Sequence, residues 1–128
     1  MDSFVQQIVN KNTYELRRHP KWDVFRDNGF CWACGHAEIE IVQWFVMQGA
    51  NLTHEQNGPL YNACEYGNTD IVKYLLTFAE VRKNAPAHSN RCLMSAQREQ
   101  YDDIETMLMH IPDVACGFSM KKWGYGMI

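Results

Sequence analysis

The sequence repeats a pattern of apolar residues, and this repetition limits the chain to a stacked architecture. The clearest unit, residues 58–76, matches the segment thirty positions earlier and the segment thirty-three positions later. Two apolar positions eight residues apart recur in four units: Ile8 and Leu16, Ala33 and Ile41, Ala63 and Ile71, and Ala96 and Ile104. Such an interval is the signature of a repeat protein, in which neighbouring units bury each other's apolar faces.

Each unit reads as two short helices. Leu60, Ala63 and Cys64 follow the i, i+3, i+4 spacing of one apolar helix face. Gly67-Asn68 is expected to end that helix, because glycine readily adopts the left-handed conformation of a helix terminus. Thr69-Asp70 then offers capping oxygens, and the apolar residues after it form the stripe of a second helix.

The clearest unit resembles the ankyrin repeat, whose first helix carries the signature Thr-Pro-Leu-His-x-Ala. Residues 58–63 read Gly-Pro-Leu-Tyr-Asn-Ala. Residues 70–76 look like the family's Glu-Ile-Val-x-Leu-Leu-Leu segment, and residues 48–52 look like its Gly-Ala-Asp-Val link. The resemblance extends over roughly residues 3–110.

This resemblance implies an all-α solenoid of helix-turn-helix repeats in a single domain of 128 residues. The expected units are an N-terminal cap (1–20), two repeats (21–52 and 53–85), a degenerate repeat (86–112) and a C-terminal cap (113–128). The last is expected to be a lone helix carrying Met120 and Trp123. Gly35-His36 looks like a displaced Gly-His turn, so the first helix of the 21–52 repeat is expected to be short.

Composition argues against several classes of function. The net charge of −3 gives no basic field to attract nucleic acid or an anionic membrane. No signal-peptide pattern and no run of 18 apolar residues occurs, which predicts an unsecreted, soluble protein. The odd number of cysteines, five, suits free thiols in a reducing compartment. The sequence therefore predicts a cytoplasmic protein, in the host cytoplasm if it is viral.

The search for reactive chemistry yields one ambiguous cluster. Cys31, Cys34 and His36 offer ligands that zinc prefers, but a fourth ligand is missing, and Cys34 aligns with the helix-packing residue Cys64. Metal binding and thiol packing both stay open. No nucleophile motif, phosphate-binding loop or HExxH segment occurs. We therefore expect a protein that is not an enzyme and uses no cofactor.

The resemblance also implies a binding face. Ankyrin arrays usually bind protein through a concave surface made by the first helices and the loop fingers. By position, this surface would carry Val24, Phe25, Asp27, His36, His54, Glu55, Asn57, Glu65, Tyr66, His88, Asn90, Arg98 and Glu99. Aromatic and arginine side chains dominate interface energetics, so Phe25, Tyr66 and Arg98 are the expected anchors.

Two hypotheses for function follow. In the first, the chain is a protein-binding module; its loosely kept repeats and the linker 79–86 look like ankyrin proteins of large DNA viruses and phages, which implies a factor that sequesters or inhibits a host protein. In the second, the chain is a structural or assembly protein that self-associates through the ends of the array, because its terminal units are weakly polar and caps normally need a polar outer face.

Overall fold

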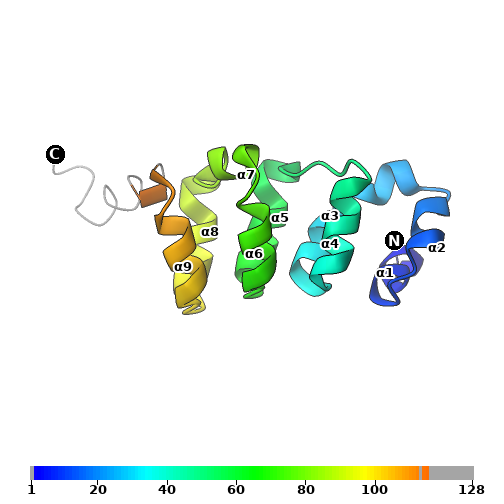
Figure 1. Cartoon of the computed structure of the whole chain (residues 1–128), viewed down its shortest axis with the longest axis horizontal. Coiled ribbons are helices and arrows are strands. Elements are labelled where there is room, and N and C mark those ends of the chain that lie inside the picture. The colour runs from blue at the N-terminus through cyan, green and yellow to red at the C-terminus, as the bar shows by residue number, and fades with distance from the viewer. Residues whose placement is uncertain (1, 113, 116–128) are drawn as a thin grey trace.

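A computed structural model describes residues 2–112, 114 and 115, and within them the chain is helical without strands. Its elements are α1 (Asp2–Val9), α2 (Thr13–Arg18), α3 (Trp22–His36), α4 (Ile39–Met47), α5 (His54–Glu65), α6 (Thr69–Leu75), α7 (Ala79–Lys83), α8 (Ala87–Arg98) and α9 (Asp102–Met109). The helices stand in pairs, side by side along one axis (Figure 1). This arrangement confirms the predicted all-α ankyrin-type solenoid.

The helix pairs form two rows. The first helices α3, α5 and α8 pack against one another in sequence, and α4, α6 and α9 form a second row in which α6 touches both neighbours. Short connections join successive pairs along one long edge of the stack, the upper edge in Figure 1, where α7 also lies. We call the row of α3, α5 and α8 the inner row and the row of α2, α4, α6 and α9 the outer row.

The apolar register predicted from the sequence forms the core. Leu60, Ala63 and Cys64 are fully buried, as are Phe30, Ala33 and Cys34 in the unit before and Leu93 and Ala96 in the unit after. The counterpart of Cys64 in the unit after is Gln97, which is half-buried. The alanine at the central position lets neighbouring helices approach closely, which increases the apolar area removed from water. The core is therefore a continuous line of contacts through the stack.

The helix ends follow local chemistry. Gly67 has φ +71°, and this left-handed residue ends the α5 segment as predicted. Thr69 and Asp70 do not supply the N-cap of α6, which is Asn68. The Asn68 side chain instead donates to the carbonyls of Cys34 and Gly35 at 2.8 Å each, so it ties α6 to the previous repeat. Asp70 accepts a hydrogen bond from the Ile71 N–H at 2.8 Å.

The expectation of a short first helix in the 21–52 repeat is wrong. Helix α3 spans 15 residues, and Gly35 and His36 lie inside its last turn. Gly35 does not make a turn; it allows close packing, since a Cβ placed there would lie 3.0 Å from the Tyr66 ring. The glycine therefore permits an inter-repeat contact where the sequence suggested a chain reversal.

The N-terminal cap is a pair of helices packed on the first repeat. At the N-terminus, α1 and α2 pair and bury Phe4 and Leu16. The Phe4 ring packs beside Trp22 and Phe45, with ring centroids 6.1 and 6.4 Å away. The predicted C-terminal cap, with Met120 and Trp123, lies outside the described residues except for positions 114 and 115.

Candidate protein-binding face

The side of the inner row turned away from the outer helices corresponds to the predicted concave surface, and we call it the inner face. An aromatic row crosses it between α3 and α5. The His36 ring lies between Trp32 and Tyr66, with centroid distances of 4.8 and 4.3 Å. Tyr66 is 51% exposed, and His36 is exposed as well. Two repeats thus present one connected aromatic surface.

A second cluster links α5 to α8 on the same face. The Arg91 guanidinium lies over the Tyr61 ring, 4.4 Å from its centroid. Arg98 pairs with Glu65 at 3.7 Å and with Glu99 at 3.4 Å. Hydrogen bonds with the Tyr61 side chain and then with Glu99 raise the pKa of Arg98. Three of the residues that the sequence assigned to this face, Glu65, Arg98 and Glu99, therefore lie together beside Tyr61, which the sequence did not assign to it.

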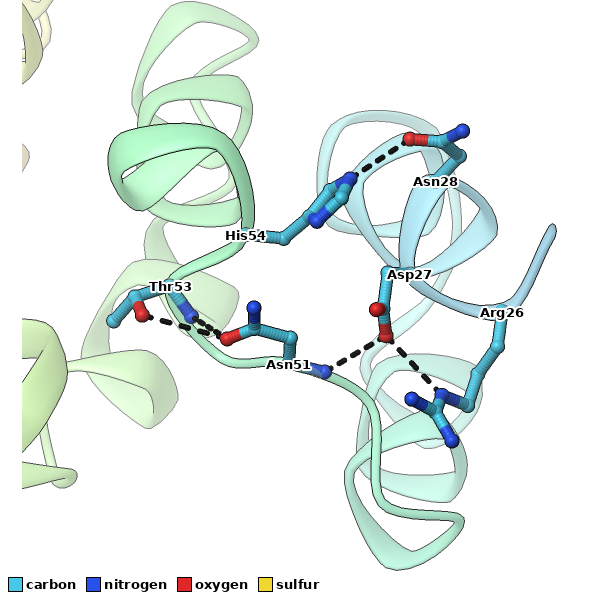
Figure 2. A network of polar contacts seen from close by, with 6 residues as sticks. All are labelled: Arg26, Asp27, Asn28, Asn51, Thr53 and His54. Carbon is cyan, nitrogen blue, oxygen red and sulfur yellow. Dashed lines mark hydrogen bonds and ion pairs between the residues drawn. The ribbon is translucent and has the colours of Figure 1, made fainter. Parts of the chain in front are cut away.

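The loop before α5 is held to α3 by the polar network in Figure 2. Asp27 accepts hydrogen bonds from the Asn51 N–H at 2.9 Å and from Arg26 Nε at 3.1 Å. Partial burial raises the pKa of Asp27, but the bonds from Asn51 and Arg26 outweigh it and hold the pKa below its usual value. His54 Nε2 lies 2.9 Å from Asn28 Oδ1. Asp27 and His54 thus position the loop.

The α5 segment begins with a left-handed turn at residues 55–57, which we call the finger, before regular helix continues to Glu65. Glu55, Gln56 and Asn57 have φ of 51°, 59° and 65°. Left-handed residues other than glycine cost about 1–2 kcal/mol each, so the turn needs support from its surroundings. Arg91 supplies it by donating to the carbonyls of Glu55 and Gln56 at 3.1 and 3.0 Å. A side chain of the next repeat therefore fixes the shape of this finger.

Two predicted contact residues are buried, and for them the prediction is wrong. Asn57 is 0% exposed and donates to the Val81 carbonyl at 3.0 Å, 24 residues further along the chain. Asn90 repeats this arrangement with the Val114 carbonyl at 3.1 Å, again 24 residues away. Both side chains attach a first helix to the connection that leaves its own repeat. They hold the array together and cannot reach a partner.

The remaining predicted residues divide by exposure. Val24 and Glu55 are exposed on the inner side. Phe25 is half-buried, because its ring packs against Phe4 and His19 with both centroids at 5.6 Å. It belongs to the N-terminal core more than to the binding face, which makes it a poor anchor. The side chain of His88 lies outside the described part of the structure.

The thiols have the properties of packing residues. Burial raises the pKa of Cys31 to about 12 and the pKa of Cys34 well above its usual value, so both stay protonated at neutral pH. Among the described residues, no group of three potential ligands is arranged to hold a metal ion. Cys31, Cys34 and His36 are therefore not gathered into a site there.

Sequence reasoning did not assign Tyr61 and Arg91 to the binding face. The signal was present in the helical spacing. Tyr61 precedes Glu65 by four residues and Arg91 precedes Arg98 by seven, which puts each pair on one helix face. What the sequence could not supply was the distance between α5 and α8, which brings Arg91 over the Tyr61 ring.

The fold and the repeat register agree with a comparison to known families. The family model described as ankyrin repeats (3 copies) matches residues 30–116. The chain belongs to the ankyrin-repeat family. No curated protein and no solved structure matches the sequence significantly. Ankyrin repeats generally mediate protein–protein interaction and are typically non-enzymatic. Within the described residues, the helices lack the length and hydrophobicity required to span a bilayer.

Proposed function

We propose that the chain is a non-catalytic module that binds a partner protein through its inner face. The observation that carries the proposal is the continuity of that face. The aromatic row Trp32, His36 and Tyr66 and the cluster around Tyr61, Arg91 and Arg98 extend over three consecutive repeats. Tyrosine, tryptophan and arginine are the residue types that most often carry the binding energy of protein interfaces.

The side chains of this face are ordered before a partner arrives. The His36 ring contacts the tilted rings of Trp32 and Tyr66, and Arg98 is held by Glu65 and Glu99. Ordering a flexible side chain on binding costs about 0.5–1.5 kcal/mol, so contacts that already restrict these groups reduce that cost. We expect Tyr66 and Arg98 to contribute most, since both are exposed.

We extend the proposal to the kind of partner. The similarity of the loosely kept repeats to ankyrin proteins of large DNA viruses and phages supports a host protein as the ligand. On this proposal the chain occupies a surface of that host protein and thereby sequesters or inhibits it, in the host cytoplasm.

Affinity capture with defined variants tests the proposal. The intact chain and the Tyr66→Ala and Arg98→Ala variants are used as bait in lysates of candidate hosts, and captured proteins are quantified by mass spectrometry. Loss of a hot-spot side chain costs about 2 kcal/mol, so each variant should retain its ligand about thirtyfold less well. Tyr14→Ala is the matched control, because Tyr14 is similarly exposed, at 62%, but lies on α2. A ligand retained equally by all four baits would contradict the assignment of this face.

A further inference from the structure

A cleft between the second and third repeats is lined by α6, α7 and α9 and by the residues that directly follow α9. It consists of two cavities of about 540 and 300 Å³, a size at which clefts bind ligands. The cavities adjoin, because His110 lines both of them and Arg82 Nη1, beside the first, donates to the carbonyl of Leu76, beside the second, at 2.8 Å. The last turns of α6 and α9 lie near α7 along the upper edge of the stack (Figure 1). We call the two cavities together the basic cleft.

The charged side chains of the basic cleft all have the same sign. Lys73, Arg82 and Lys83 line it and are exposed. Within the described part of the chain, no acidic residue lines either cavity, and the ion pairs found there involve other side chains than these three. Because the whole chain has a net charge of −3, the cleft is a local concentration of positive charge on an acidic protein.

The helix ends explain the sign of these charges but do not neutralise them. Lys73 lies in the last turn of α6, and Arg82 and Lys83 lie in the last turn of α7. A helix C-terminus carries about half an elementary negative charge, which favours a cation there. Two helix ends therefore offset about one of the three full charges, and a net positive charge remains. The carboxylate of α7, Glu80, is exposed and does not line the cleft.

The less exposed part of the basic cleft is apolar. Leu76 and Met107 are half-buried and Ile111 is 9% exposed, whereas the cations around them are exposed. A flat bilayer surface does not enter such a cleft. Nucleic-acid bases would find no Phe, Tyr or Trp ring among the lining residues on which to stack. A peptide segment that carries carboxylates around an apolar side chain matches both layers of the cleft.

We propose that the basic cleft binds an acidic segment of a protein, with its carboxylates on Lys73, Arg82 and Lys83 and an apolar side chain between them. The His110 ring is oriented for a peptide, since Nδ1 donates to the Thr106 carbonyl at 2.7 Å and leaves Nε2 of the neutral ring to accept a peptide N–H. None of the lining residues comes from the inner row. The cleft is therefore a second site, which does not rest on the function proposed for the inner face.

Fluorescence anisotropy with the intact chain tests the proposal. The probe is a short labelled peptide of glutamates around a central pair of leucines. Its affinity should fall when salt is added, because salt screens exposed charges. The same peptide with glutamine for glutamate should bind at least about tenfold less tightly, and an all-glutamate peptide about fivefold less tightly, because it loses the apolar contact. Absence of saturable binding, equal binding of the glutamine peptide, or tighter binding of a single-stranded oligonucleotide of the same net charge overturns the proposal.

Charge reversal locates the peptide in the cleft. Lys73→Glu and Lys83→Glu should each weaken probe binding about tenfold, because each replaces an attraction by a repulsion. Lys21→Glu is the matched control, since Lys21 is also exposed but precedes α3. Tyr66→Ala should leave the probe bound, so failure of this site and failure of the inner face are distinguishable. Circular dichroism confirms that each variant is folded; equal loss in the Lys21 variant overturns the assignment. A tenfold gain in Asp113→Asn would mean that the chain's own carboxylate fills the cleft, and overturns it too.

Discussion

At each of the two junctions between repeats, a side chain of the first helix is hydrogen-bonded to the backbone of the connection that follows it. The direction of this hydrogen bond differs between the two junctions. At the first junction, Asp27 accepts a bond from the Asn51 N–H. At the second, Asn57 donates to the Val81 carbonyl, and both bonds span 24 residues. The first connection is non-helical at Asn51, so its N–H is available to a side chain, whereas α7 already uses the Val81 N–H in a bond to Phe78. Where the N–H of the connection is free, the side chain of the first helix must be an acceptor. Where that N–H is already bonded within a helix, the side chain must be a donor to the carbonyl.

The third unit shows that the rule is general within the described chain. Asn90 donates to the Val114 carbonyl, and the Val114 N–H is already bonded to Ile111. Asn57 and Asn90 also share a second property, because the Oδ1 atom of each is buried without a hydrogen-bond partner. This cost, about 1–3 kcal/mol for each atom, is absent at the solvated first junction.

Exchanging the residue types between junctions should have the largest effect at the buried one. Asn57→Asp would set a buried carboxylate against the Val81 carbonyl with no donor, at a cost of about 3–5 kcal/mol in the free energy of unfolding. Burial would raise the folded pKa of the introduced carboxyl above its unfolded value, so the loss should shrink as the pH falls through that raised pKa. Urea unfolding at neutral and mildly acidic pH measures both effects. An unchanged midpoint at neutral pH would refute the donor requirement.

The second junction also depends on Arg91, a cation supplied by the following repeat. Arg91→Ala should lower the free energy of unfolding by about 2 kcal/mol, since two charge-assisted bonds and the contact with Tyr61 are lost. Hydrogen exchange of the amides at residues 55–57 should accelerate at the same time. Arg91→Lys should be intermediate, because it keeps the charge and loses the two-pronged geometry. Protection at these amides that survives in the alanine variant would mean that the finger does not need Arg91.

The first junction depends instead on a glycine. Gly49 has φ +85°, and a Cβ added there would meet no atom within 4 Å, so Gly49→Ala introduces backbone strain alone. We expect a loss of about 1 kcal/mol. Gly67→Ala is the comparison, because there the added carbon would also lie 2.8 Å from the Tyr101 ring and the loss should be larger. Thermal unfolding of the two variants measures the difference. The unfolding temperature should fall further for Gly67→Ala, which adds steric overlap to backbone strain, than for Gly49→Ala.

The smallest effect is expected for the reciprocal exchange. Asp27→Asn keeps an oxygen that can accept from Asn51 and loses only the charge toward Arg26, so the cost at neutral pH should be about 0.5 kcal/mol or less. Because the folded pKa of Asp27 is lowered, its contribution is present above the usual aspartate value of 3.8 and is lost as the pH falls through the lowered value. The variant should therefore lose less stability than the native chain on acidification, as followed by unfolding at several pH values.

Most of the fold was predictable because repetition multiplies a weak local signal. The apolar positions in the four units aligned at one spacing, and the residues at those positions are buried. The exposed residues of the inner face were predicted less well, since position in a repeat does not reveal which polar side chains are already bonded within the array. Asn57 and Asn90 looked like contact residues for that reason, and Gly35 looked like a turn although it serves the packing of Tyr66.

By itself, the sequence determined the helix pairs, their stacking and the family, because the spacing of the apolar residues indicates which positions of each helix are buried. Only the tertiary structure decided what the polar residues do. The direction of the bonds at Asp27 and Asn57 depends on whether the backbone they meet is helical, and the placement of Arg91 depends on the distance between neighbouring helices. Both are properties of segments far apart in the chain, so no local pattern contains them.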